Sequence, residues 1–308
     1  MAAFAGCTEF SIEDTDDTLA PGAVIEETFV PNPLPRVDIL WVLDNTASMA
    51  EELAYLRANS REFLDALDEQ EVSWHMALVA TETNDDEFGV LFGNPWVVTP
   101  SMPTASDDFA DLFDVDLAKS AEGAGLSVAL AALHPERLDD ENRGFRRPNA
   151  ALHVVVVSDE DDGSDERMDS DPADTFVDEL AHHSETTGFP AVCSAIVGPQ
   201  SSGCIGQAGR ALPGRRYIDV AQRTGGSVQS ICNPDLASIA SRVAELSAPL
   251  ETRFALQGTP TANGTAVWVD GVRTATGWHI DPGGPALVFE RPPQRGALIR
   301  IRYTVMEP

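Results

Sequence analysis

Two stretches of the sequence constrain the fold most, because each is an apolar run that ends abruptly in an aspartate. The first, "VDILWVLD", covers residues 37–44, and the second, "ALHVVVVSD", covers residues 151–159. Near-continuous apolar runs of this length, interrupted here only by Asp38 and His153, are typical of strands that are buried on both faces, as in a parallel sheet between layers of helices. Polar residues therefore follow directly at the carboxyl end of each predicted strand.

The rest of the chain up to residue 249 alternates apolar strands with amphipathic helices. Helical spacing is clearest in residues 49–70, and further strands are expected at residues 72–83, 88–100, 189–199 and 227–233. The strand at 88–100 is expected at an edge or in a hairpin, because a Gly-Asn-Pro turn interrupts it. This pattern predicts an α/β fold, doubly wound around a mostly parallel six-stranded sheet, and we expect the strand order 3-2-1-4-5-6.

The sequence pattern changes at both ends of this predicted domain, which covers residues 36–249. Residues 250–308 contain short alternating strands divided by turn signals such as "NGT" and "DPGG", and they predict a small C-terminal antiparallel β module. In its last strand Ile299, Ile301 and Tyr303 should face inward, while Arg300 and Arg302 face water. Residues 1–35 are acidic and rich in proline, as an extended tether would be.

The charge of the chain restricts its partners. Lys and Arg number 20 against 50 Asp and Glu, which gives a formal charge of −30. Such a charge argues against nucleic acid and anionic lipid surfaces as partners, and it favours cations.

The first residues bear on the location of the protein. "AFAGC" at Ala3–Cys7 resembles the lipobox of bacterial lipoproteins, in which the cysteine is lipidated. Only six residues precede Cys7, too few for a signal peptide, so either the start is placed late or the likeness is accidental. The resemblance implies an exported protein of the bacterial envelope, or a secreted one, whose contact with a membrane is limited to a lipid anchor at Cys7.

Asp44 and Asp159 follow the two most apolar strands, which are adjacent in the expected order. Ligands of open parallel sheets bind beyond the carboxyl ends of the strands, at the point where neighbouring connections diverge. The two carboxylates should therefore converge there. Hydroxyl groups of Thr46 and Ser48 could reach the same point, and oxygen ligands of this kind suit a hard divalent cation.

The five residues Asp44-Asn45-Thr46-Ala47-Ser48 resemble the DxSxS or DxTxS motif of von Willebrand factor type A domains. The likeness covers about residues 36–248. It implies a metal-ion-dependent adhesion site in which Thr46 and Ser48 bind the ion directly, Asp44 acts largely through water, and Asp159 completes the set. It also implies a function without catalysis: an ion, with Mg²⁺ expected and Ca²⁺ or Mn²⁺ as alternatives, that binds an acidic side chain of another protein.

One position departs from that family. The family usually supplies a threonine from the loop before the third helix, whereas this chain reads "KSAEGAG" at residues 119–125. Glu122 is the nearest candidate ligand and Ser120 the second. A carboxylate at this position would neutralise more of the charge of the ion and weaken its attraction for an acidic partner.

Two alternatives remain open for the Asp44 loop. Ser48 or Thr46 could instead cap the following helix, with Glu51 three residues after Ser48 completing a capping box, and this role is compatible with metal binding. A metal-dependent phosphohydrolase of the haloacid dehalogenase type would also place an Asp after its first strand. That family needs a second Asp two residues later, however, and this chain has Thr46 there.

The remaining candidate residues have structural interpretations. Cys204 and Cys232 are expected to form a disulfide in an exported protein, with Cys193–Cys204 as the competing pair. His153 lies in an apolar strand and is expected to be a core residue with its hydrogen bonds satisfied. The acidic run that follows Asp159 is expected to be a solvated loop.

Overall fold

The computed structural model describes ten stretches of the chain, and these form two compact units. One unit combines the chain before residue 32 with the chain after residue 251, and the other is Asn32–Glu251. No helix in the described stretches is long and apolar enough to span a membrane. The described residues are 22–31, 36–70, 72–81, 87–117, 123–168, 170–206, 209–232, 250–261, 264–294 and 296–305.

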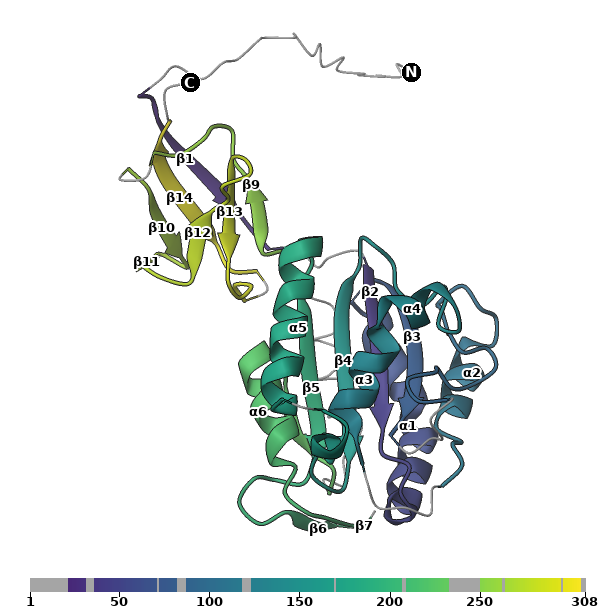
Figure 1. Cartoon of the computed structure of the whole chain (residues 1–308). Coiled ribbons are helices and arrows are strands. Elements are labelled where there is room, and N and C mark those ends of the chain that lie inside the picture. The colour runs from purple at the N-terminus through teal and green to yellow at the C-terminus, as the bar shows by residue number, and fades with distance from the viewer. Residues whose placement is uncertain are drawn as a thin grey trace, which may run out of the picture. The chain divides into compact units, whose positions relative to one another are not determined.

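The larger unit is built on a sheet of five parallel strands in the order β3-β2-β4-β5-β8 (Figure 1). The two strands that end in aspartate are central neighbours, and Leu43 lies opposite Val157. The strands are β2 (Arg36–Leu43), β3 (Ser73–Ala80), β4 (Ala151–Ser158), β5 (Ala191–Val197) and β8 (Val228–Ser230).

Helices cover both faces of this sheet, as the predicted doubly wound α/β fold requires (Figure 1). Successive residues of β2 face opposite sides of the sheet. Trp41 packs with the helices α1 and α2 on one side, whereas Leu40 packs with α3, α5 and α6 on the other. The helices are α1 (Ala50–Asp68), α2 (Ala105–Leu112), α3 (Gly125–Leu133), α4 (Pro135–Asp139), α5 (Pro172–Thr187) and α6 (Arg215–Thr224), with short 3₁₀ turns η1 (Ala47–Met49) and η2 (Ser164–Glu166).

The prediction of six strands in this sheet is wrong by one strand. Residues 88–100 make only two isolated antiparallel bridges to β3, Met76–Val98 and Leu78–Phe92. Gly93 between them has φ 108°, and Pro95 has no N–H to donate to a ladder, so regular pairing cannot continue through this segment. The five other strands follow the predicted order. The sequence also predicts a helix at residues 234–248, and these residues lie outside the described stretches.

The smaller unit is antiparallel throughout its described strands and consists of two sheets, β1-β14-β10-β11 and β12-β13-β9. The alternation predicted for the last strand is confirmed, because Ile299, Ile301 and Tyr303 are fully buried in its core. The strands are β1 (Val24–Phe29), β9 (Arg253–Ala255), β10 (Ala266–Val269), β11 (Val272–Thr274), β12 (Trp278–Ile280), β13 (Ala286–Phe289) and β14 (Ile299–Thr304).

The tether predicted for residues 1–35 differs from the structure in its last third. Val24–Phe29 form β1, which pairs with β14 along its whole length, from Val24–Thr304 to Phe29–Ile299. The apolar residues Ile25 and Phe29 pack against the core of the module, which is the physical reason that this acidic segment becomes a strand. Cys7 lies outside the described residues.

Candidate cation site

The candidate site lies at the carboxyl ends of β2 and β4, where Asp44 and Asp159 emerge from neighbouring strands. The main-chain N–H of Asp44 donates to the carbonyl of Val157 across 2.9 Å, which continues the ladder between the two strands into the site. The side chains of Asp44 and Asp159 are almost fully buried, at 0% and 3% exposure. The two acid-terminated strands thus bring these residues together from distant parts of the chain.

The loop after Asp44 connects its two hydroxyl groups to Asp159, because the Thr46 hydroxyl contacts Ser48 and the Ser48 hydroxyl contacts Asp159. The N–H of Thr46 donates to Oδ1 of Asp44 at 2.9 Å, which folds the loop back over the carboxylate. Thr46 Oγ1 lies 3.1 Å from Ser48 Oγ, and Ser48 Oγ donates to Oδ1 of Asp159 at 3.2 Å. The four predicted side chains therefore form one connected cluster of oxygen atoms.

The helix-capping alternative for this loop is wrong. The residue that precedes α1 is Met49, and the one that precedes η1 is Thr46, and neither makes a side-chain capping hydrogen bond. The hydroxyl groups of Thr46 and Ser48 are directed to each other and to Asp159 instead.

Ser158 is part of the cluster and was not among the predicted residues. Its hydroxyl donates to Oδ2 of Asp44 at 2.5 Å, so both oxygens of Asp44 are held by the protein. The signal was present in the sequence, because Ser158 directly precedes Asp159 at the end of an apolar strand.

Gly123 lies beside Asp44 and fixes where the chain enters α3. A Cβ atom on Gly123 would stand 3.5 Å from Oδ2 of Asp44. The carbonyl of Gly123 accepts from the N–H of Gly163 at 2.9 Å and from the hydroxyl of Tyr217 at 3.3 Å. Glu122 and Ser120, the candidates for the remaining ligand, precede Gly123 and lie outside the described residues.

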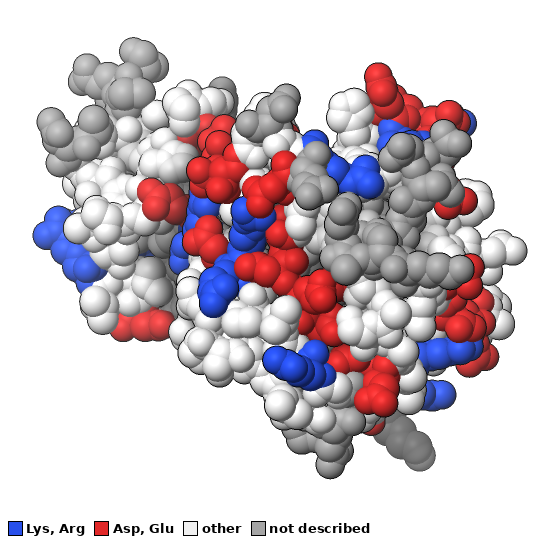
Figure 2. Space-filling model, turned by 60° about the horizontal axis from the view of Figure 1, so that its bottom comes forward, with Lys and Arg blue, Asp and Glu red and all other residues white. Residues whose placement is uncertain are grey.

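The electrostatics of the cluster fit a cation. Burial and the neighbouring charge of Asp44 raise the pKa of Asp159 to about 6, because removing two carboxylates from water disfavours the charged form. Among the described residues, neither Asp44 nor Asp159 forms an ion pair with a basic side chain. Figure 2 shows Asp and Glu gathered over the middle of the face that it presents, with several basic side chains among them.

Glu52, in the first turn of α1, adds a third buried carboxyl group to this region. It is 3% exposed, and its Oε2 has no hydrogen-bond partner. Burial, and then the charges of Asp159, Glu51 and Asp44, raise its pKa to about 7. A Cβ atom on Gly209 would overlap Oε1 of Glu52, so the chain at Gly209 packs directly on this carboxyl group. Sequence reasoning missed Glu52 because its helical position resembles that of its exposed neighbour Glu51.

The acidic run after Asp159 is solvated only in its later part, where Asp165 and Asp171 are exposed, and its first residues differ from the prediction. Asp162 is 5% exposed and accepts hydrogen bonds from the N–H of Leu126 and from Ser164, so it caps the start of α3. Asp161 accepts from the N–H of Arg216 in the first turn of α6. Carboxylates near helix N-termini are favourable, and these two hold the helices that surround the site.

The two predicted cysteines form a disulfide, Cys204–Cys232, and Cys193 is a buried free thiol. The bridge joins the end of β8 to a small hairpin of β6 (Cys204–Gly206) and β7 (Gly209–Ala211). The N–H of Leu212, next to β7, donates to the carbonyl of Asp159 at 2.7 Å. The hairpin is therefore attached to the rim of the candidate site.

The described residues contain no group of three or more His, Cys, Asp or Glu that could hold a metal ion. The cluster at Asp44 combines two carboxylates with two hydroxyl groups and is of a different kind. His153 is a buried neutral residue whose Nε2 lies 2.8 Å from Ser194 Oγ, and burial lowers its pKa to about 3.

Comparison with known proteins gives distant structural likenesses only. No protein-family model matches the chain, and no curated protein matches it in sequence. Among solved structures, a von Willebrand factor type A protein from Catenulispora acidiphila is 13% identical over 96% of this chain and 67% of its own, with a TM-score of 0.46. The protein BatB from Bacteroides thetaiotaomicron is 14% identical over 68% of this chain and 98% of its own, with a TM-score of 0.40.

A pilus adhesin, SpaC from Lactobacillus rhamnosus GG, is 12% identical over 94% of this chain and 41% of its own, with a TM-score of 0.38. With TM-scores below 0.5, the functional assignment rests on the residues of this chain itself.

Proposed function

We propose that the cluster at the ends of β2 and β4 holds one divalent cation, and that this cation binds an acidic side chain of a partner protein. The observation that carries the proposal is that a chain of hydrogen bonds links Asp44 to Thr46, Thr46 to Ser48 and Ser48 to Asp159. The motif of the Asp44 loop supports it, because it resembles that of metal-dependent adhesion sites.

The donor set fits a hard cation. Two buried carboxylates without a basic counterion lack charge compensation, and a divalent ion would supply it. Thr46 and Ser48 would contribute neutral oxygen ligands beside Asp159, and Asp44 would be held in place by the N–H of Thr46 and the hydroxyl of Ser158. With few charged ligands, the ion would attract a carboxylate from another protein. We propose Mg²⁺, with Ca²⁺ or Mn²⁺ as substitutes.

We propose that the site binds and does not catalyse. A phosphohydrolase of the haloacid dehalogenase type would use Asp44 as nucleophile and an acid–base carboxyl group two residues later. The side chain at that position is Thr46, whose hydroxyl contacts Ser48. Both oxygens of Asp44 are engaged by hydrogen bonds, which also leaves it poorly placed to attack a substrate.

We propose an exported location, in the cell envelope or outside the cell. The disulfide Cys204–Cys232 supports it, since such bridges persist in oxidising compartments. The lipobox-like Ala3–Cys7 would add a lipid anchor at Cys7.

The partner interaction is tested by capture of envelope proteins on the immobilised chain, in Mg²⁺ and then in chelator. We expect bound protein to be released by chelator and by excess glutamate, and to be absent with Ser48→Ala. The control is Asp178→Ala, which removes an exposed carboxylate from α5. If the amount of captured protein were unchanged by chelator and by Ser48→Ala, adhesion through the ion would be refuted. A metal-dependent phosphatase activity lost in Asp44→Asn would favour the rival function.

A further inference from the structure

We propose that the open edge of β11 in the smaller unit binds an extended segment of a partner protein in which acidic and apolar residues alternate. β11 is the last strand in the order β1-β14-β10-β11, and within the described residues it pairs with β10 alone. An open edge of this kind is a ready template for a further strand. This site is separate from the candidate cation site and does not depend on the function proposed for it.

The register of the β10–β11 hairpin directs the main chain of Arg273 to the open edge. Asp270 and Gly271, with φ 49° and 78°, form a two-residue turn between Val269 and Val272. In such a hairpin the two residues that flank the turn, here Val269 and Val272, hydrogen-bond to each other through their main chains. The next two opposed residues do not. The next pair is Trp268–Arg273, so the N–H and C=O of Arg273 point away from β10.

The outer face of the sheet carries more basic than acidic side chains, in contrast to the chain as a whole, which carries −30. The strands place Arg273, Arg300 and Arg302 on this face together with Glu26, which forms an ion pair with Arg300 at 3.6 Å. One row across the four strands reads Thr28, Arg300, Trp268 and Arg273. The guanidinium of Arg300 lies 4.3 Å over the ring of Trp268, a cation–π contact that holds the row in place. Acidic side chains of an added strand would lie beside Arg273, the residue of this row that is on the edge strand.

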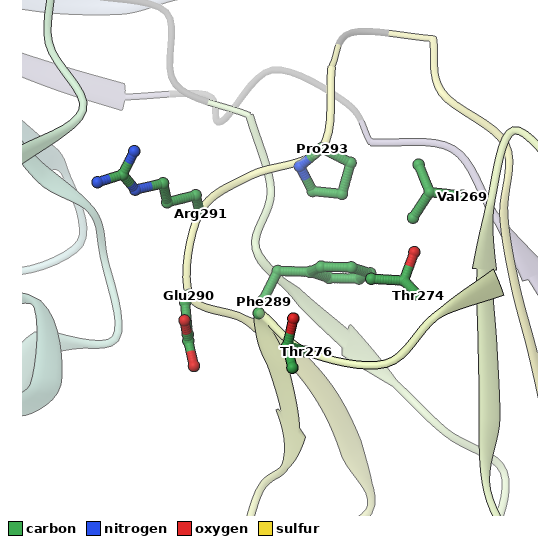
Figure 3. Close-up of a pocket in the computed structure, with 8 residues that line it drawn as sticks. Val269, Thr274, Thr276, Phe289, Glu290, Arg291 and Pro293 are labelled. Carbon is green, nitrogen blue, oxygen red and sulfur yellow. The ribbon is translucent and has the colours of Figure 1, made fainter. Parts of the chain in front are cut away.

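The inner side of β11 faces an apolar pocket instead. A pocket of about 250 Å³ lies between the two sheets, with Val269 and Thr274 on one wall and Phe289 on the other (Figure 3). Pro293 lies across from the Phe289 ring, and Glu290 and Arg291 come from the adjoining loop. Val272, on the same side of β11 as Thr274, is 70% exposed. The pocket is smaller than those that hold drug-sized ligands, so it suits single apolar side chains.

The two faces together define the partner. Successive side chains of a strand point to opposite faces, so a strand added to β11 would direct every second residue to the arginine row and the others to the pocket. A segment that alternates acidic and apolar residues matches both. Because β11 has three residues, its main chain would set the register while the side chains provide most of the affinity.

The test uses fluorescein-labelled peptides and the full chain, with fluorescence anisotropy as the readout. The first peptide repeats Asp-Leu, the second has the same composition with all Asp before all Leu, and the third repeats Lys-Leu. We expect binding of the first peptide only, weaker at high salt because exposed charges are screened. N-methylation of its edge-facing amides should weaken binding, because it removes the main-chain hydrogen bonds that set the register. Equal binding of the first two peptides would overturn the proposal.

Three variants locate the site. Arg273→Glu reverses the charge on the outer face and should weaken binding by about tenfold or more. Thr276→Trp, at an exposed residue that lines the pocket, should fill it and weaken binding to a similar extent. Arg215→Glu makes the same charge change on exposed surface of the other unit and should leave binding unchanged.

Binding that survives both Arg273→Glu and Thr276→Trp would contradict the proposal. An anionic polysaccharide such as polygalacturonate is the competing occupant. If it displaced the peptide and its own binding were sensitive to Arg273→Glu but not to Thr276→Trp, the face would be a glycan surface and the strand proposal would be wrong.

Discussion

The hydroxyl of Ser158 donates to Oδ2 of Asp44 across 2.5 Å, and this bond ties the carboxyl ends of β2 and β4 together at the candidate site. Ser158 also accepts from the N–H of Glu160 at 3.0 Å, so one side chain orients Asp44 and the loop that carries Asp159. In the proposed cation site, Ser158 would position Asp44 rather than bind the ion.

Ser158→Ala should therefore weaken both the fold and the site. The loss of a buried hydrogen bond to a charged group should lower the free energy of unfolding by about 1.5–3 kcal/mol in the absence of metal. Affinity for Mg²⁺ should fall, because Asp44 is no longer held on its second oxygen. Denaturant unfolding and calorimetry measure the two effects. Ser158→Thr keeps the hydroxyl and should restore most of the metal affinity; no rescue would argue against a positioning role.

The buried carboxyl group of Glu52 should make the metal-free protein less stable as pH rises. Its pKa is raised from 4.5 to about 7, so folding favours the protonated form. The stability that this provides is fully present below pH 4.5 and is lost as pH rises to about 7. Glu52→Gln keeps a neutral side chain, so in chelator above pH 7 it should be more stable than the wild type by about 1–3 kcal/mol.

Urea unfolding across this pH range, with chelator present, tests the role of Glu52. Glu51→Gln is the matched control, because Glu51 is the exposed neighbour in the same helical turn. We expect the pH dependence of Glu51→Gln to follow the wild type. Identical profiles for wild type and Glu52→Gln would show that Glu52 is not the titrating group.

The disulfide should stabilise the larger unit by restricting the unfolded chain. Cys204 and Cys232 are 28 residues apart, and bridges that close loops of this size are typically worth about 2–4 kcal/mol. The double variant Cys204→Ser, Cys232→Ser should lose that amount and should become insensitive to reducing agents. Peptide mapping without reduction checks the pairing. A Cys193–Cys204 peptide would contradict the structure, in which Cys193 is buried in the core.

A buried ion-pair cluster at the opposite end of the sheet should be a major contributor to stability. Asp38, fully buried at the start of β2, accepts from Arg146 at 2.6 Å and from Arg147 at 2.7 Å. Asp38→Asn leaves the two cations without a counterion and should cost about 3–5 kcal/mol, while metal affinity stays unchanged. Arg61→Gln, which breaks an exposed pair with Asp65 in α1, should cost less than about 1 kcal/mol. Equal costs would show that the Asp38 cluster is not a buried network.

The features that could be predicted from sequence are those encoded locally. The apolar runs before Asp44 and Asp159 identify central strands of a parallel sheet, and parallel strands bring their carboxyl ends to one edge, so the two carboxylates could be placed together. β1 could not be predicted, because its partner β14 follows about 270 residues later and only that pairing turns an acidic segment into a strand.

The same reason applies to the loop after Asp159. Asp161 and Asp162 resemble solvated acids in sequence, and they become caps only because α6 and α3 begin beside them.

The most direct test of the proposed cation site is calorimetric titration of the chelator-treated chain with Mg²⁺ and Mn²⁺, for wild type, Asp159→Ala and Asp178→Ala. The proposed site predicts one bound ion for the wild type and for Asp178→Ala, and no measurable binding heat for Asp159→Ala. Equal binding heats for all three proteins would contradict a cation site built from Asp44, Thr46, Ser48 and Asp159.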